Sequence, residues 1–346
     1  MMDVARTAGV AASTVSHVVN NTRFVHPETR AAVEAAIAAI GYIPNTIARS
    51  LARSRTGTVG LAISLESNPY FVALVHEIVA ECAKRDLLVL LSDTGEDPDR
   101  ELAVVRTFHR RRVDAVLLAP VGLGSGQRTL SYLSEAKLPT VLVDRLIAPS
   151  FNQVGVDNRA GIALLFAHLR ALGHTRIGMI GGQPGIATTI ERIDAFRILA
   201  QEAGLPDVAA SEPLLSTNVA TACEAALALL ASPDRPSAVI AGNNQSMIGL
   251  MQAVRRLGLS VPADLAVAGF DDFEWADCFH PRLTVVSQPV HEIGQHALLL
   301  LDGALEDGPA TPRTIQLQPE LVVRESCGTP SPGRPSKKLA RSARSR

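Results

Sequence analysis

Near the amino terminus, small and hydrogen-bonding side chains share one face of a stretch with helical spacing. Hydroxyl, imidazole and carboxamide groups donate and accept hydrogen bonds, which is what the base edges in the DNA major groove require. This chemistry predicts a DNA-reading surface. Its members are Ala12, Ser13, Thr14, Ser16, His17 and Asn20.

A second set of polar side chains follows short apolar runs farther along the chain. Carboxylates and amides bind hydroxyl groups, an arginine binds an oxygen or a carboxylate, and an aromatic face stacks on a ring, so the set suits a sugar or sugar derivative. Taken singly, each aspartate or asparagine is also a common helix cap or turn former. The candidates are Asn68, Tyr70, Phe71, Asp93, Asp144, Arg145, Asn243 and Asp271.

Two short helices must position the first set. An apolar face of Val4, Ala5 and Ala8 stops at Gly9, and a second helix opens near Ser13 after a turn of about four residues. Its inward residues are Val15, Val18 and Val19. This arrangement predicts a helix-turn-helix, although a pair of surface helices in any small domain is the alternative.

A third helix and a hinge complete the amino-terminal region. Pro27 opens the third helix, Val33, Ile37 and Ile40 face inward, and Gly41 ends it. We therefore predict a three-helix headpiece at 1–44. The hinge segment at 45–56 is too short to hold a helix in isolation, so we expect it to order against DNA or a partner.

The remainder of the chain predicts an α/β core. Apolar runs that alternate with helical stretches indicate parallel sheets covered by helices on both faces, and the rhythm occurs once before and once after about residue 158. Two such halves place a cleft at the carboxyl ends of their strands. The expected strands are 59–63, 87–91, 113–119, 140–143, 177–180, 238–241 and 265–269.

Composition agrees with an intracellular protein of two or three domains. The 346 residues are 47% hydrophobic, no apolar run approaches a membrane span, and we expect no export signal. The four cysteines form no Cys-x-x-Cys pair, which favours buried or incidental thiols in a reducing cytoplasm. They are Cys82, Cys223, Cys278 and Cys327.

Charge is distributed unevenly along the chain. Residues 1–58 hold six basic and three acidic side chains, residues 59–328 hold 21 and 31, and residues 329–346 hold six and none. The basic ends favour nucleic acid. The tail at 329–346 is predicted to be disordered, either as a solvated appendage or as a nonspecific DNA tether. The arginines available for phosphates near the amino terminus are Arg6, Arg23, Arg30, Arg49, Arg53 and Arg55.

Motifs in a characteristic order lie at 3–10, 13–21, 27–30, 41–51, 68–71, 112–114, 144–145, 172–174, 191–192, 269–272 and 283–285. Together they resemble the lactose-repressor (LacI/GalR) family of bacterial transcription regulators, with the headpiece most similar to its purine-responsive branch. The resemblance implies a periplasmic-binding-protein-like core at 57–328. One subdomain would comprise 57–157 plus 289–316, and the other 158–288 plus 317–328.

The same resemblance assigns roles to single residues. Arg192 and Asp271 would bind the effector and approach it from opposite sides of the cleft. Tyr70 and Phe71 would face the effector. Ile186 stands where the purine-responsive branch has a second arginine, and Asn218, also a candidate contact, stands where it has a stacking aromatic. In the hinge, Leu51 would enter the minor groove at the centre of a palindromic operator. Ala52 beside it is a further candidate DNA contact, and the hinge position of Arg49 and Arg53 predicts phosphate contacts.

These observations favour a cytoplasmic, homodimeric DNA-binding regulator, more specifically a repressor, that responds to a sugar-like effector and needs no metal or cofactor. A solute-binding protein and a nucleobase-responsive regulator are the alternatives. An enzyme is disfavoured because Asp271 and Asp272 are adjacent and should point in different directions, and because 176–182 lacks a full Gly-x-Gly-x-x-Gly. The chain departs from the family at Met1-Met2-Asp3, where the first helix lacks its usual cap and about two residues.

Overall fold

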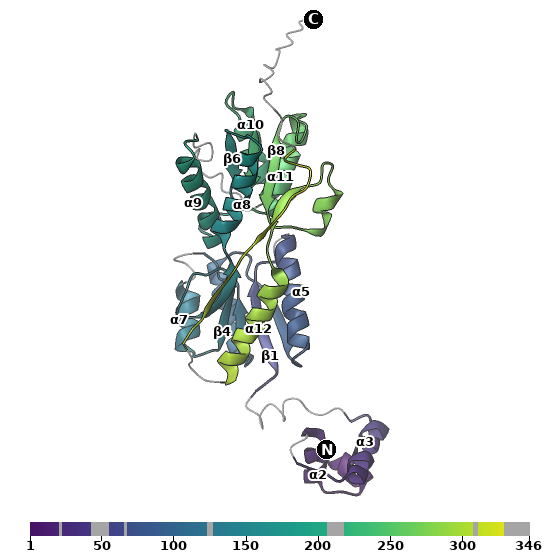
Figure 1. Cartoon of the computed structure of the whole chain (residues 1–346). Coiled ribbons are helices and arrows are strands. Elements are labelled where there is room, and N and C mark those ends of the chain that lie inside the picture. The colour runs from purple at the N-terminus through teal and green to yellow at the C-terminus, as the bar shows by residue number, and fades with distance from the viewer. Residues whose placement is uncertain are drawn as a thin grey trace, which may run out of the picture.

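The computed structural model describes residues 1–20, 23–42, 55–65, 68–122, 127–205, 218–306 and 311–328 (Figure 1). The described part comprises a three-helix headpiece and a core built on two sheets. The predicted hinge residues Arg49, Leu51, Ala52 and Arg53 and the basic tail lie outside the described residues. Among the residues that are described, no helix is long and apolar enough to cross a membrane.

The headpiece contains the predicted helix-turn-helix. Its helices are α1 (Met2–Ala8), α2 (Ala12–Asn20) and α3 (Pro27–Ile40). Gly9 and Gly41 cap α1 and α3 in the left-handed conformation that glycine adopts without strain. As expected, the N-cap residue of α1, Met1, makes no side-chain capping hydrogen bond. The shared core consists of Val4, Ala5, Val15, Val18, Val33 and Ala36.

Two headpiece expectations were wrong in detail. Ile40 is 42% exposed because it is the last residue of α3, and Ala36 supplies the core contact instead. Ala12 is half-buried and packs against the headpiece core, so it does not point away from the apolar side.

The first core subdomain is a six-stranded parallel sheet in the order β10-β5-β4-β3-β1-β2. Helices α5 (Pro69–Ala83) and α12 (Val290–Glu306) pack against one face, and α6 (Pro98–Arg110) and α7 (Gln127–Glu135) against the other (Figure 1). The strands are β1 (Thr58–Ile63), β2 (Leu88–Asp93), β3 (Ala115–Leu118), β4 (Thr140–Asp144), β5 (Asn152–Val156) and β10 (Thr314–Leu317).

The second subdomain is a five-stranded sheet in the order β11-β9-β8-β7-β6. Helices α8 (Asn158–Ala171) and α9 (Ala187–Glu202) cover one face, and α10 (Val219–Ala231) and α11 (Asn244–Arg256) the other; η1 (Glu274–Cys278) follows β8. The strands are β6 (Ile177–Ile180), β7 (Ala238–Ala241), β8 (Ala266–Phe270), β9 (Thr284–Ser287) and β11 (Glu320–Val322).

The chain passes between the two sheets three times, after β5, after β9 and after β10. Leu317 pairs with Val156 in the first sheet, so the predicted start of the last segment of the second subdomain at residue 317 was wrong by one residue. The carboxyl ends of the strands in the two sheets face each other. The chain leaves β10 at the carboxyl end of the first sheet and therefore enters the second sheet at the carboxyl end of that sheet's other strands. Strand β11 is therefore antiparallel to β9, whereas the other strand pairs among the described residues are parallel, as predicted.

The outer strand β2 also departs from the expected pattern. Leu88 is 69% exposed and Leu91 is 41% exposed, so helices do not cover both faces at this edge. The sequence patterns missed β5, β9, β10 and β11, because these strands are short and mix apolar with polar residues. All four cysteines are free thiols, and three of them are buried.

Candidate functional site

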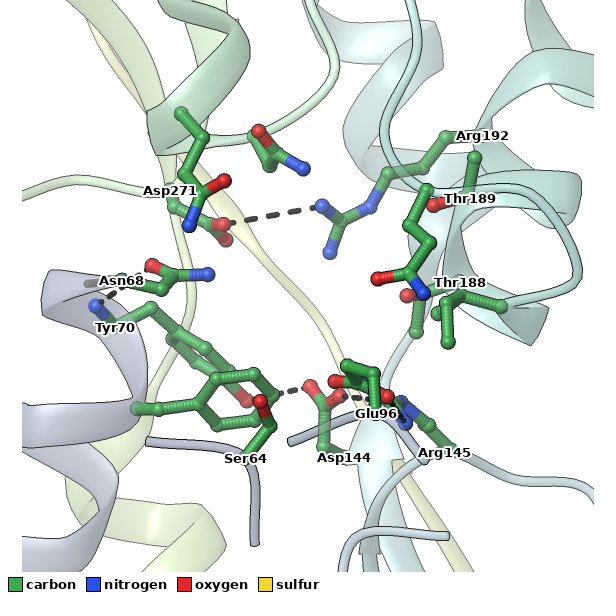
Figure 2. A pocket seen from close by; sticks show the side chains of 15 residues that line it. Ser64, Asn68, Tyr70, Glu96, Asp144, Arg145, Thr188, Thr189, Arg192 and Asp271 are labelled. Atoms are coloured by element: carbon green, nitrogen blue, oxygen red, sulfur yellow. Dashed lines mark hydrogen bonds and ion pairs between the residues drawn. The ribbon is translucent and has the colours of Figure 1, made fainter. Parts of the chain in front are cut away.

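A polar cleft lies between the two subdomains, at the facing carboxyl ends of their strands (Figure 2). The first subdomain contributes Ser64, Asn68, Tyr70, Phe71, Glu96, Asp144 and Arg145. The second contributes Gln183, Ile186, Thr188, Thr189, Arg192, Asn243, Gln245 and Asp271.

Asp144 is the central acceptor on the first wall. It ends β4 with a φ of 70°, a left-handed conformation that is costly for a non-glycine residue and recurs at functional sites. The Tyr70 hydroxyl donates to Asp144 Oδ1 over 2.8 Å, and Arg145 Nε lies 3.6 Å from Asp144 Oδ2. All three side chains are buried, so the aspartate is oriented before any ligand arrives.

Glu96 holds the other side of Arg145. Arg145 Nη1 donates to Glu96 Oε2 over 2.8 Å and Nη2 donates to Oε1 over 2.6 Å. Arg145 Nη1 also donates to the Pro120 carbonyl over 2.7 Å, and the guanidinium carbon lies 5.9 Å from the centre of the Phe71 ring. These contacts leave Arg145 with one fixed orientation.

Arg192 and Asp271 form the second wall. Arg192 Nε donates to Asn158 Oδ1 over 2.8 Å, Nη1 donates to the Gly242 carbonyl over 2.7 Å, and Nη1 lies 3.8 Å from Asp271 Oδ2. The guanidinium lies 3.6 Å above the centre of the Phe270 ring. Asp271 has a φ of 76° and accepts from Gln288 Nε2 over 2.6 Å.

Burial dominates the electrostatics of the cleft. It raises the pKa values of Asp144 and Asp271, and Arg145 and Arg192 respectively lower them in part. Burial, followed by the charge of Asp144, raises the pKa of Tyr70 well above its usual value. The Tyr70 hydroxyl therefore remains a donor to Asp144 at neutral pH.

Several cleft residues also cap helices. Asn68 Oδ1 accepts from the Tyr70 N–H at the start of α5 over 3.1 Å, and Asn243 Oδ1 accepts from the Ser246 N–H at the start of α11 over 2.8 Å. Asn244 Nδ2 donates to Asn68 Oδ1 over 3.2 Å and so links the two subdomains. Capping and lining the cleft are therefore compatible roles for one side chain.

Eight of the ten candidate effector contacts line the cleft, and two do not. Asp93 ends the outer strand β2, where its carboxylate accepts from Leu65 N–H and Gly95 N–H and pairs with Arg100. Asn218 caps α10 by accepting from Thr221 N–H over 3.0 Å. Arg192 and Asp271 are both in the second subdomain, so the expectation that they approach a ligand from opposite sides was wrong.

Sequence reasoning missed six polar lining residues. Ser64 directly follows β1, and Thr188 and Thr189 lie in the first turn of α9, so strand-end and helix-start positions gave a usable signal. Glu96 lies in a turn with a φ of 53°, which no local pattern marked. The complete set is Ser64, Glu96, Gln183, Thr188, Thr189 and Gln245.

The outward face of α2 carries most of the predicted DNA-reading residues. Ser13 is exposed, and Thr14, Ser16 and His17 are half-buried. Asn20 ends the helix, but its side chain lies outside the described part. Arg23 is exposed after α2. This face can present hydroxyl and imidazole groups to base edges.

The described end of the hinge is anchored to the core. The N–H groups of Thr56 and Gly57 each donate to the Asp114 carboxylate over 2.7 Å. The Arg55 guanidinium donates to the Leu305 carbonyl at the end of α12. These contacts fix the chain that leads to the headpiece to the first subdomain.

We expect His17→Ala to relax base specificity rather than to weaken binding uniformly. Loss of one base contact should cost about 1–3 kcal/mol at a single operator position in each half-site. Fluorescence anisotropy with operators substituted one base pair at a time measures this. Arg23→Ala is the control, because loss of a phosphate contact lowers affinity for all sequences and reduces the salt dependence. A uniform loss for His17→Ala would contradict base readout.

Glu101, fully buried on α6, predicts a pH dependence of stability. Burial raises its pKa from 4.5 to about 7, although the Val121 N–H donates to it and Arg145 attracts its charge. Between these pH values the folded chain keeps a proton that the unfolded chain releases, so the free energy of unfolding should fall as pH rises, by up to about 3 kcal/mol.

Glu101→Gln should remove that part of the pH dependence. Urea unfolding at about pH 5 and about pH 7.5 measures it, and Glu202→Gln, a change of an exposed residue at the end of α9, should keep the wild-type dependence. Equal pH dependence in wild type and Glu101→Gln would show that Glu101 does not hold the proton.

A helix-turn-helix headpiece joined to a two-subdomain cleft defines a class: DNA-binding regulators with a ligand-binding core. Residues 1–45 match the bacterial regulatory proteins of the lacI family, and residues 166–327 match the periplasmic binding protein-like domain. The ribose operon repressor of Escherichia coli strain K12 is 34% identical over 327 residues, which cover 94% of this chain and 99% of the relative. The chain belongs to the lacI family and is a transcriptional regulator.

Further relatives agree with this assignment. The transcriptional repressor PurR of Vibrio vulnificus strain CMCP6 is 32% identical, with 94% of this chain and 97% of the relative covered. The lac repressor dimer bound to operator and the anti-inducer ONPF superposes with a TM-score of 0.83 at 26% identity, over 94% of this chain and 98% of that one. The predictions of an α/β core and of a regulator rather than an enzyme are confirmed.

Proposed function

We propose that this protein represses transcription in the cytoplasm by binding a palindromic operator as a homodimer, and that a sugar or sugar derivative in the cleft controls the binding. The observation that carries the proposal is the cleft lining. Carboxylates, amides and hydroxyls from both walls converge beside the Phe71 ring. This combination suits a ring compound with many hydroxyl groups.

The coupling between cleft and DNA follows from the anchoring of the hinge. In a dimer, two hinge segments leave the core from their Asp114 anchors. A ligand that favours one arrangement of the subdomains changes the separation of these segments. Because such short segments form helices only with a partner, the change makes or breaks their pairing on DNA. We assign Leu51 to the minor groove at the operator centre, with Arg49 and Arg53 on phosphates.

A nucleobase effector is the second candidate, because PurR is among the similar proteins. Two features of the chain disfavour it. Ile186 lines the cleft where a second arginine is expected for a purine, and Asn218 caps α10 away from the cleft, so the first wall alone supplies aromatic side chains among the described lining residues.

A thermal-shift screen of the purified full chain tests the proposal. A ligand that binds the folded state raises stability with the logarithm of its concentration over its dissociation constant. The panel contains pentoses, hexoses, polyols, sugar acids and nucleobases, and each compound that stabilises the protein is then tested for its effect on operator affinity. Stabilisation by nucleobases and by no sugar would refute the sugar assignment.

A further inference from the structure

Glu96 lines the cleft, and both of its carboxylate oxygens accept hydrogen bonds from Arg145. It joins Arg145 through two nearly parallel bonds of 2.8 and 2.6 Å, and the two side chains are 9% and 4% exposed. Figure 2 shows the pair at the base of the cleft beside Asp144. A guanidinium bound in this two-bond manner cannot offer the same N–H groups to a ligand carboxylate or phosphate.

The second cleft arginine, Arg192, also has partners within the protein. Arg192 donates to Asn158 and Gly242 and lies 3.8 Å from Asp271 (Figure 2). Its positive charge is therefore offset within the second wall. Each of the two guanidiniums therefore already has a carboxylate neighbour within the protein.

The charges of the described lining residues add to this effect. Glu96, Asp144 and Asp271 outnumber the two arginines by one, so the cleft is negative when all are ionised. The core segments outside the described residues, at 66–67, 123–126, 206–217 and 307–310, contain no lysine or arginine. Burial already raises the pKa values of Asp144 and Asp271, so a further negative charge would be costly.

We propose that Glu96 is a specificity-determining residue that occupies Arg145 and thereby restricts the effector to an uncharged polyhydroxyl compound, against sugar acids and sugar phosphates. The inference rests on the proposed sugar-responsive function of the cleft. A hydroxyl group needs an acceptor, which Asp144 and Asp271 supply. An anion needs free donors on a cation, and Glu96 occupies one N–H on each terminal nitrogen of Arg145.

The test compares neutral aldoses with the aldonates obtained by oxidising their first carbon. D-Ribose, D-xylose and D-galactose and the corresponding aldonates are titrated against the full chain by thermal shift and calorimetry. Wild type should bind at least one neutral sugar and no aldonate. Glu96→Gln removes the negative charge and one of the two acceptors that hold Arg145, so it should raise aldonate affinity by about tenfold or more, because a charge-assisted bond from Arg145 becomes available to the ligand.

Glu202→Gln is the matched control. It removes the same charge from an exposed position at the end of α9 and should leave the neutral and aldonate affinities unchanged. The double variant Glu96→Gln/Arg145→Met should lose the aldonate gain, because it lacks the freed cation. The comparison of ligands on wild type needs no variant, so it decides the ligand class even when Glu96→Gln folds poorly.

The outcomes separate this inference from the function on which it rests. Aldonate binding to wild type as tight as neutral-sugar binding overturns the role of Glu96 and leaves a sugar-responsive cleft. If wild type binds neither the neutral sugars nor the aldonates, both the proposed function and the assignment of an uncharged effector are overturned. Whether Glu96 keeps Arg145 from binding an anion is then tested with inorganic phosphate. Phosphate should stabilise Glu96→Gln but neither wild type nor the double variant. Equal stabilisation of all three proteins would refute this role of Glu96.

Discussion

Arg192→Ala should abolish the ligand response while operator binding is retained. Arg192 connects Asn158, Gly242 and Asp271 on the second wall of the cleft, so its removal empties the centre of that wall. It also leaves Asp271 buried without its neighbouring cation. Breaking a buried pair in this way costs on the order of 3–5 kcal/mol, so the core should also lose stability. Asp271→Asn, which keeps the shape of the side chain, should lose the response with a smaller loss of stability.

Operator affinity measured by fluorescence anisotropy, with and without a sugar that stabilises wild type, gives the readout. Arg197→Ala is the matched control. Arg197 lies on the same helix, its side chain is 41% exposed, and it pairs only loosely with Asp194 at 3.8 Å, so its replacement should preserve the response. An Arg192→Ala protein that responds at the wild-type sugar concentration would remove this residue from the effector site.

Arg324→Met should both destabilise the core and weaken sugar binding, although Arg324 does not line the cleft. Arg324 donates to both carboxylate oxygens of Asp272 at 3.0 Å, to the Leu283 carbonyl at 2.9 Å, and pairs through Nε with Asp277 at 2.7 Å. These contacts hold the segment that follows Asp271. We expect a loss of about 2–3 kcal/mol in the free energy of unfolding and weaker sugar binding, because the Asp271 carboxylate is less well positioned.

Urea unfolding and calorimetry measure the two effects. Arg282→Met is the matched control, because the Arg282–Glu325 pair is nearby but half exposed, and exposed pairs contribute little. It should change neither stability nor affinity measurably. If Arg324→Met lowers stability but leaves sugar affinity at the wild-type value, then the Asp272 network is structural and does not position Asp271.

Local patterns in the sequence determined the headpiece. Gly9, Pro27 and Gly41 mark helix ends by backbone chemistry that needs no distant contact, and the valines at 15 and 18 mark the inward face of α2. Strands β1, β4, β7 and β8 were recognisable because burial on both faces makes them continuously apolar. Polar residues directly after these strands were the right candidates for the cleft.

Only the tertiary structure decided which strand ends reach that cleft. Asp93 and Asp144 both end parallel strands of one sheet, yet β2 is at the outer edge and β4 lies inside, so Asp144 faces the cleft and Asp93 binds Arg100. Strand order depends on pairings between distant segments, which no local pattern encodes. The place of Glu96 in the cleft could not be predicted for the same reason, because its partner Arg145 lies 49 residues away in the chain.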